Sequence, residues 1–429
     1  MTQIMTKSKA RIAVLLAVGL VVCTVGARAE IPGLTGPTFN LTAREGYIDL
    51  PTGDIVYMWG YGVSENINMQ YPGPTLIVNQ GDTVTVNLEN ELEEPVSIIF
   101  PGQENVYASG GQPGNITQEA LDGGGMVSYT FVANKPGTYI YHSGTNTQLQ
   151  LEMGLFGALI VRPTIAMQAY NHPDSAYDRE VLFLESEVDP LIHELVVTGN
   201  KDKIDFSQYF PVMWFINGRA APDTMAPAGA GWLPNQPYNC MPMIHPGEKL
   251  LMRMINAGRD YHPFHTHGNH MRIIAQDGLL LESSPGLGAD LSFMDFTHTV
   301  PPGGTADSIF SWTGEQLGWD IYGHAPEDAM ELNEYAPDHG KPFPVVLPDI
   351  KDLAYGTHYS GSPYLGTFGY IPPGDCRPNM NAGYFYMWHS HKEKEMTTNN
   401  VFPGGMMTML LIEHPSVTIG MMGAGLTCR

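Results

Sequence analysis

The chain has 429 residues, and its 44 acidic against 21 basic residues give a net charge of −23. Such an acidic chain is unfavourable for binding to nucleic acid or to anionic membrane surfaces, and we expect neither as a partner. The length, together with 48 glycines and 34 prolines, indicates more than one domain and many turns.

Residues 1–29 have the features of a removable export signal. Basic residues at positions 7, 9 and 11 precede an apolar run over 12–25, and Ala27-Arg-Ala29 provides a small-x-small cleavage pattern before Glu30. The run is too short to favour a membrane span. We therefore expect a secreted or periplasmic protein with no membrane span. Without these residues the chain has 17 basic against 44 acidic residues, a net charge near −27.

Strand patterns recur along the rest of the chain, whereas long helical periodicity is nearly absent. Polar and apolar residues alternate in each pattern, as expected for half-buried antiparallel strands. The segments run over 82–88, 137–142, 180–185, 250–255 and 384–389. Short strands separated by turn residues predict an all-β fold built from β-sandwiches.

Histidines are concentrated in two late segments. The first is His262-Pro-Phe-His265-Thr-His267, and the second is Trp388-His389-Ser-His391. Two histidines separated by one residue lie on the same face of a strand, about 6–7 Å apart. Two facing strands of this kind would offer four imidazoles to one metal ion. Imidazole ligands suit copper, and zinc is the main competitor.

A long segment lies between the two histidine patterns. Over about 319–380 the sequence is rich in proline, glycine, tyrosine and acidic residues. A loop of this length inside a domain is usually functional or part of an interface, although a surface excursion without a role is an alternative. We expect an insertion that either covers the histidine site or contacts a neighbouring subunit.

Three cysteines follow the export signal, at Cys240, Cys376 and Cys428. In an oxidising compartment one pair could form a disulfide and leave one thiol, and the sequence does not choose the pair. Methionine is also abundant, with 24 residues. Thioethers bind Cu(I), but methionines also fill gaps in cores, and both interpretations stay open.

Several motifs in order resemble the multicopper oxidase family. Tyr71-Pro-Gly-Pro-Thr75, the strand at 81–87 and the hairpin of 137–143 with 154–161 resemble a first laccase-type cupredoxin domain. Phe215-Ile-Asn-Gly-Arg219 and 253–258, leading into His262, resemble the last domain. About 50 residues separate the two parts. The resemblance therefore implies the two-domain branch, similar to copper nitrite reductases, with two cupredoxin-like Greek-key β-sandwich domains at 31–165 and 175–415.

The resemblance also implies the metal ligands. Copper ligands of the three-copper cluster match His265, His267, His389 and His391, and His142 in Tyr141-His-Ser-Gly144 is a fifth candidate. Ile99, Pro101 and Gly144 stand where three further histidines are expected. His262 matches the first ligand of the blue copper site and Met406 its axial methionine. Ser390 replaces the cysteine, and residues 392–401 contain no second histidine.

Two functions follow as expectations. The first is a copper-dependent oxidoreductase that lacks the blue copper site and has an incomplete three-copper cluster. The alternative is a non-catalytic copper-binding or scaffold protein that retains the fold. Two-domain relatives imply a homotrimer in which neighbouring subunits share ligands. The substrate, a small molecule or a metal ion, is not defined by the sequence.

Overall fold

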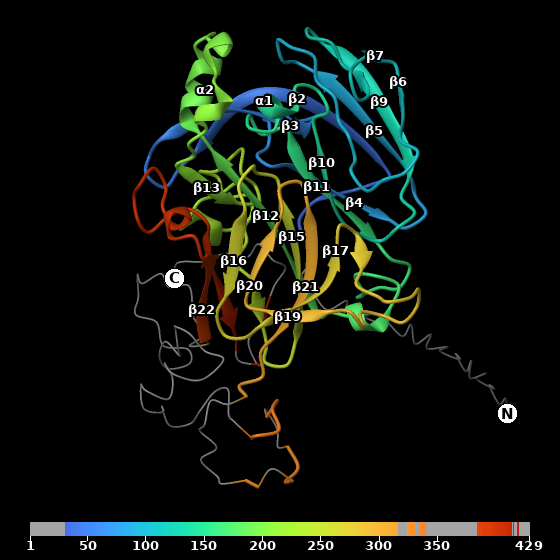
Figure 1. The fold of residues 1–429 in the computed structure, drawn as a ribbon, viewed down its shortest axis with the longest axis vertical. Coiled ribbons are helices and arrows are strands. Elements are labelled where there is room, and N and C mark those ends of the chain that lie inside the picture. Colours follow the sequence, from blue (N-terminus) through green and yellow to red (C-terminus); the bar gives the residue numbers. More distant parts are fainter. Residues whose placement is uncertain are drawn as a thin grey trace, which may run out of the picture.

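The computed structural model describes residues 31–315 and 384–413, together with the short stretches 324–325, 327–330, 334–339, 415 and 418–419. Strands dominate this part of the chain, and they form two pairs of packed sheets (Figure 1). The all-β, cupredoxin-like sandwich fold predicted from the sequence is confirmed. Each of the five predicted strand segments coincides with a strand, and the segment predicted over 137–142 forms β10 with those same bounds.

The first pair of sheets is built from the N-terminal strands, which occupy the upper part of Figure 1. One sheet has the order β1-β4-β11-β10 and the other β3-β2-β5-β9-β6, with a separate small ribbon of β7 and β8. The strands are β1 (Leu34–Thr35), β2 (Thr38–Asp49), β3 (Ile55–Val63), β4 (Gly73–Asn79), β5 (Thr83–Asn90), β6 (Tyr107–Ser109), β7 (Gln112–Pro113), β8 (Gln118–Glu119), β9 (Gly125–Val132), β10 (Gly137–His142) and β11 (Phe156–Arg162).

The second pair of sheets is built from the later strands. One sheet has the order β13-β12-β15-β21-β17-β18, with β19 paired to β17, and the other has the order β14-β23-β22-β16-β20. The strands are β12 (Arg179–Val188), β13 (Met213–Ile216), β14 (Met243–Ile244), β15 (Lys249–Asn256), β16 (His262–Thr266), β17 (Met271–Gln276), β18 (Leu279–Leu280), β19 (Phe293–Asp295), β20 (Thr297–Val300), β21 (Thr305–Ser311), β22 (Tyr384–Ser390) and β23 (Met407–Ile412).

Helices are short in the described part of the chain. The α-helices are α1 (Thr147–Gln150) and α2 (Pro190–Val197), and single 3-10 turns occur at Pro173–Ser175, Lys201–Lys203, Phe206–Gln208, Asp223–Met225 and Glu393–Met396. Helix α2 begins where Asp189 accepts a hydrogen bond from the Leu191 amide, with Pro190 in the first turn. It packs against β3. No helix in the described residues is long and apolar enough to cross a membrane.

Each pair of sheets encloses its own apolar core. The first core contains Trp59, Tyr61 and Tyr129, and the second contains Trp214, Trp312 and Trp388. The second core lies directly behind strands β16 and β22, since Phe264 and Trp388 point into it. This packing fixes the two strands on which the histidines are placed.

A buried polar cluster joins the two pairs of sheets. Thr138 of β10 donates a hydrogen bond of 2.6 Å to Asp307 of β21 and accepts one of 2.9 Å from Arg253 of β15. Arg253 is also paired with Glu180 at 2.9 Å, and both side chains are almost completely buried. Because each charge has an opposite partner, this contact can be buried without an isolated ion. It holds the first sandwich against the second.

Some of the predicted features lie on residues that the structure does not describe. The export signal at 1–29 and Cys376 and Cys428 lie outside the described residues, as does most of the insertion at 319–380. Cys240 is a free, fully buried thiol in the second core. Burial raises the pKa of this thiol to about 12. The domain limits at 31–165 and 175–415 stay a prediction.

Candidate metal centre

Adjacent strands bring four histidines together at one end of the second sandwich. Strands β16 and β22 are antiparallel neighbours, and His265 is paired directly with His389. His267 and His391 follow two residues later on the same face of each strand. The ring centroids of His265 lie 4.9 Å from His267, 5.5 Å from His389 and 4.9 Å from His391. We call these four residues the histidine cluster.

The spacing of the ring nitrogens fits a metal site. One nitrogen each from His265, His267 and His389 lies within 4.8 Å of the other two. The Nε2 atoms of His267 and His389 are 3.2 Å apart. His391 stacks against His389 at 5.7 Å and is exposed, so it lies on the solvent side of the cluster. The donor set consists of imidazole nitrogens, which suit copper or zinc far better than calcium or magnesium.

The inner histidines of the cluster are held in the neutral form. Burial lowers the pKa of His265 to about 4, and the neighbouring imidazoles act in the same direction. Burial also lowers the pKa of His389. A neutral imidazole keeps a lone pair on one ring nitrogen, which is the state that a metal ligand requires. These residues are therefore ready to bind a metal ion at neutral pH.

Hydrogen bonds on the far side of the rings orient this lone pair. The Nδ1 atom of His265 lies 2.7 Å from the Thr297 hydroxyl of β20, and Nδ1 of His389 lies 2.7 Å from the Ser390 carbonyl. A carbonyl oxygen can only accept, so Nδ1 of His389 carries the proton and Nε2 carries the lone pair. Metal-binding histidines are usually fixed in this way by an outer partner.

His262 does not join the histidine cluster. It lies three residues before His265 on β16, so its side chain points to the opposite face of the strand, into the protein. Its Nε2 atom is 2.8 Å from Glu187, and its Nδ1 atom is 3.0 Å from Glu395. Burial opposes a charge on this ring, but the hydrogen bonds that the ring donates to both carboxylates outweigh it and raise the pKa to about 10. The ring is an imidazolium with both nitrogens engaged.

The partners of His262 form a buried network. Ser390 donates a hydrogen bond of 2.5 Å to the same Glu395 oxygen that contacts His262, and Lys392 lies 3.0 Å from the other oxygen. Glu187 also accepts hydrogen bonds from the backbone amides of Arg259 and Asp260. Glu395 therefore fills the position between His262 and Ser390. Met406, buried in the second core, donates its amide to the Glu395 carbonyl.

A third carboxyl group lies beside this network. Both side-chain oxygens of Glu185 are buried without a hydrogen-bond partner. Burial raises the pKa of Glu185 to about 8, since His262 only partly compensates the loss of water. Glu185 is therefore protonated at neutral pH.

The first sandwich contributes one histidine in a different setting. His142 ends β10, and its Nδ1 atom lies 2.9 Å from the Ser143 carbonyl. Burial lowers its pKa. The Ile99 backbone pairs with that of His142, and a Cβ added to Gly144 would lie only 2.7 Å from the Ile99 methyl group. An isoleucine thus occupies the space beside His142. No grouping of ligand atoms in the described residues joins His142 to the histidine cluster.

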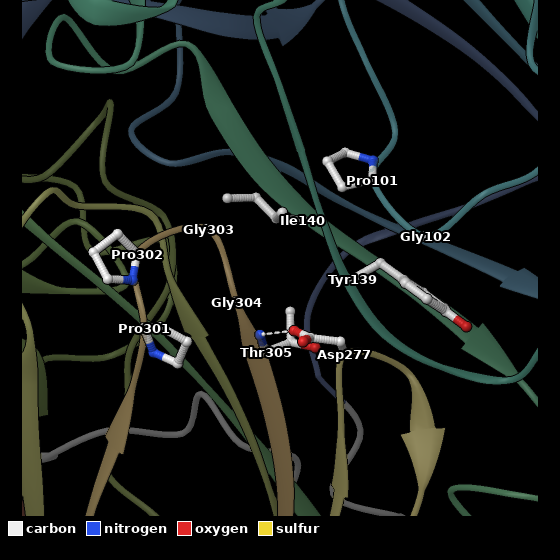
Figure 2. A pocket seen from close by; sticks show the side chains of 10 residues that line it. All are labelled: Pro101, Gly102, Tyr139, Ile140, Asp277, Pro301, Pro302, Gly303, Gly304 and Thr305. Atoms are coloured by element: carbon white, nitrogen blue, oxygen red, sulfur yellow. Dashed lines mark hydrogen bonds between the residues drawn. The ribbon is translucent and has the colours of Figure 1, made fainter.

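A cavity of about 370 Å³ opens between the two sandwiches, away from these histidines (Figure 2). Pro101 and Gly102 of the first sandwich face the turn Pro301–Thr305 of the second across it. Its one charged side chain, Asp277, already accepts a hydrogen bond of 3.0 Å from the Thr305 amide. None of the six histidines predicted as metal ligands lines this cavity.

Sequence reasoning missed the carboxylates around His262. Glu395 lies in the segment 392–401, where a histidine was expected and only its absence was noted. The signal available was the acidic character of Glu393 and Glu395 beside Ser390. Of the two interpretations left open for methionine, the filling of core gaps agrees with the packing of Met225, Met241, Met243 and Met409 into a small apolar cluster with Leu411.

Comparison with known proteins finds relatives of this sequence. The sequence profile of the multicopper oxidases matches residues 62–165. Copper resistance protein A of Escherichia coli is 26% identical over 315 residues, which cover 67% of this chain and 49% of that protein. An iron transport multicopper oxidase of Epichloe festucae is 31% identical over 240 residues, 54% of this chain and 34% of that protein. The chain thus spans about half or less of the length of these relatives.

The fold has a counterpart among solved structures. A blue copper oxidase from Nitrosomonas europaea superposes with a TM-score of 0.56 at 20% identity, covering 87% of this chain and 85% of that one. At this level of identity the likeness concerns the fold. Together with the profile and the relatives, it shows that this chain resembles multicopper oxidases in its fold and in part of its sequence.

Proposed function

We propose that this chain is an exported copper-binding protein that holds copper in the histidine cluster. The observation that carries the proposal is the convergence of His265, His267 and His389, with their ring nitrogens within 4.8 Å of one another. The low pKa of His265 supports it, because a neutral ring can bind a metal without first losing a proton. His391 completes the set from the solvent side.

We further propose that the chain is a copper-dependent oxidoreductase without a blue copper site. Copper held by imidazoles would supply a centre that exchanges one electron with a substrate. The protein's own residues provide the rest: Thr297 orients His265, the Ser390 carbonyl orients His389, and exposed His391 leaves one side accessible. On the other face, Glu395 contacts both His262 and Ser390, and Ser390 has a hydroxyl where a blue copper site needs a thiolate.

The same network supports the alternative function, a non-catalytic copper-binding or scaffold protein. In this alternative, the ion pairs of His262 with Glu187 and Glu395 occupy the place of the blue copper site, through which electrons would otherwise enter. The two functions differ in whether bound copper is reduced and reoxidised by a small molecule. Turnover of oxygen with a reducing substrate, measured against the His265→Ala/His391→Ala variant, separates them.

Optical spectroscopy tests the proposed absence of the blue site. A copper–thiolate bond gives an intense absorption band, and Ser390 stands in the position of the cysteine. We expect copper-loaded protein to lack this band and to oxidise phenolic laccase substrates negligibly. Ser390→Cys alone should not restore either property, because Glu395 already holds His262. An intense thiolate-to-copper band in the native protein would contradict the proposal.

We also propose a homotrimer in which His142 of one subunit approaches the histidine cluster of the next. Within one chain His142 lies apart from the cluster, so a contribution to the same metal ion requires another subunit. Light scattering at micromolar concentration tests this arrangement. A strict monomer would exclude the trimer and leave the histidine cluster of the single chain intact.

A further inference from the structure

A second group of side chains that could bind a metal ion lies inside the predicted insertion. One ligand atom each from His324, Glu334 and His339 lies within 4.8 Å of the other two. The Nδ1 atom of His339 is 2.8 Å from a Glu334 carboxylate oxygen. The His324 and His339 rings stack with their centroids 4.5 Å apart. None of these residues belongs to the histidine cluster.

The burial of this group points to a missing partner. His339 is 1% exposed and Glu334 6%. The Nε2 atom of His339 is buried and has no hydrogen-bond partner. Leaving a buried polar atom unsatisfied costs about 1–3 kcal/mol. A structural Glu334–His339 pair would satisfy only one nitrogen of the His339 ring. A bound ion, in contrast, would be held by His324, Glu334 and His339 together.

We propose that His324, Glu334 and His339 bind a divalent transition-metal ion. Two imidazole nitrogens and one carboxylate oxygen make a donor set that suits zinc and its neighbours, and calcium or magnesium would prefer oxygen ligands alone. Three protein ligands leave a further position for water or another donor. Binding requires neutral rings, so an ion displaces any proton held between His339 and Glu334.

The surroundings indicate a structural role for this ion. Tyr335 lies between two ligands in sequence, and a Cβ added to Gly247 would come within 2.9 Å of its ring. The neighbouring Ala336 is fully buried. Residues 334–339 therefore pack on the Gly247 turn, just before β15. An ion that also binds His324 would fasten this part of the insertion to the second sandwich.

Zinc titration of the metal-free full-length chain tests the proposal, by calorimetry in the His265→Ala/His391→Ala background. We expect one zinc ion per chain. His324→Ala should weaken this binding by about 100-fold or more, because losing a ligand should cost at least as much as losing an outer partner. The His324 ring is partly exposed, so this variant should keep its fold, which circular dichroism checks. His339→Gln and Glu334→Gln should have the same effect.

His172→Gln is the matched control, since this partly buried histidine caps a turn far along the chain from the site. It should leave zinc binding unchanged. The proposal is overturned if the background protein binds no zinc at micromolar concentration. It is also overturned if folded His324→Ala and His339→Gln variants bind zinc as tightly as the background does. Neither result affects copper binding at the histidine cluster, which is measured on the other set of residues.

Discussion

The two faces of strands β16 and β22 use the same residue type in opposite ways. On the outer face, His265 and His389 are surrounded by other imidazoles, and burial lowers the pKa of each. On the inner face, His262 lies between Glu187 and Glu395, and these carboxylates raise its pKa to about 10. Three residues of separation thus divide a candidate metal ligand from a buried cation. The neighbours, rather than the histidine itself, determine which role is available.

Removing His262 should have the largest effect. His262→Ala leaves Glu187 and Glu395 buried without their cation, and breaking such a pair costs about 3–5 kcal/mol. Denaturant unfolding of the metal-free protein should show this loss. His391→Ala, on the exposed side of the outer face, should change the free energy of unfolding by less than about 0.5 kcal/mol. Similar losses in both variants would contradict the distinction between the faces.

The inner face also predicts that the protein loses stability at alkaline pH. His262 has a pKa of about 10 against an ordinary 6.5, and Glu185 one of about 8 against 4.5. Both groups bind protons more tightly in the folded state. Their contribution is therefore full at low pH, and it is lost as pH rises, through 4.5–8 for Glu185 and 6.5–10 for His262.

Each unit of pKa difference corresponds to about 1.4 kcal/mol, so roughly 5 kcal/mol from His262 should be lost between pH 6.5 and 10, with roughly 2 kcal/mol more from Glu185 between pH 6.5 and 8. The free energy of unfolding measured across this range checks the prediction. Glu185→Gln should make the decline in stability below pH 8 shallower and leave the decline above pH 8, which comes from His262, unchanged. A stability that rises with pH over the whole range would show that His262 is not held as an imidazolium.

On the outer face, Thr297 should affect copper affinity and not stability. Thr297→Val removes the hydroxyl that contacts His265 and keeps the shape of the side chain. Losing an outer partner of a metal ligand typically costs 10–100-fold in affinity, and we expect about that loss for copper. Thr299→Val, an exposed position on the same strand β20, is the matched control. Equal copper affinity in both variants would remove Thr297 from the site.

His142→Ala should have the smallest effect on copper. The ring lies outside the cluster of its own chain, so it can contribute only through a neighbouring subunit. We expect a loss of copper affinity of about tenfold or less, below the range given for outer partners. The loss should disappear in any variant that is monomeric by light scattering. A loss as large as that of the cluster residues would make His142 a principal ligand.

The sequence predicted the fold and the placement of four histidines on one face, for physical reasons that are local. Alternation along 384–389 and the spacing of His265, His267, His389 and His391 place side chains on one face regardless of their neighbours. The inner face was not predictable in the same way. Glu187 lies 75 residues before His262 and Glu395 lies 133 after it, so the network depends on tertiary packing.

The insertion at about 319–380 likewise contains contacts that depend on tertiary packing and could not be predicted from the sequence. Its acidic residues were visible in the sequence, but His324 and His339 are 15 residues apart with no strand or helix pattern to relate them. Only the folded chain brings them to Glu334. The opposite orientation of the two histidines on β16, in contrast, could be predicted from the sequence. His262 and His265 are three positions apart and therefore face opposite sides of the strand.

Copper content tests the central claim most directly. The wild-type chain and the His265→Ala/His391→Ala variant are loaded with copper, dialysed and analysed for copper per chain. A second variant, His172→Ala/His245→Ala, removes two histidines outside the cluster. We predict that the cluster variant binds one copper ion per chain fewer than the wild type and this control. Wild-type copper content in a folded cluster variant would contradict the assignment of the site.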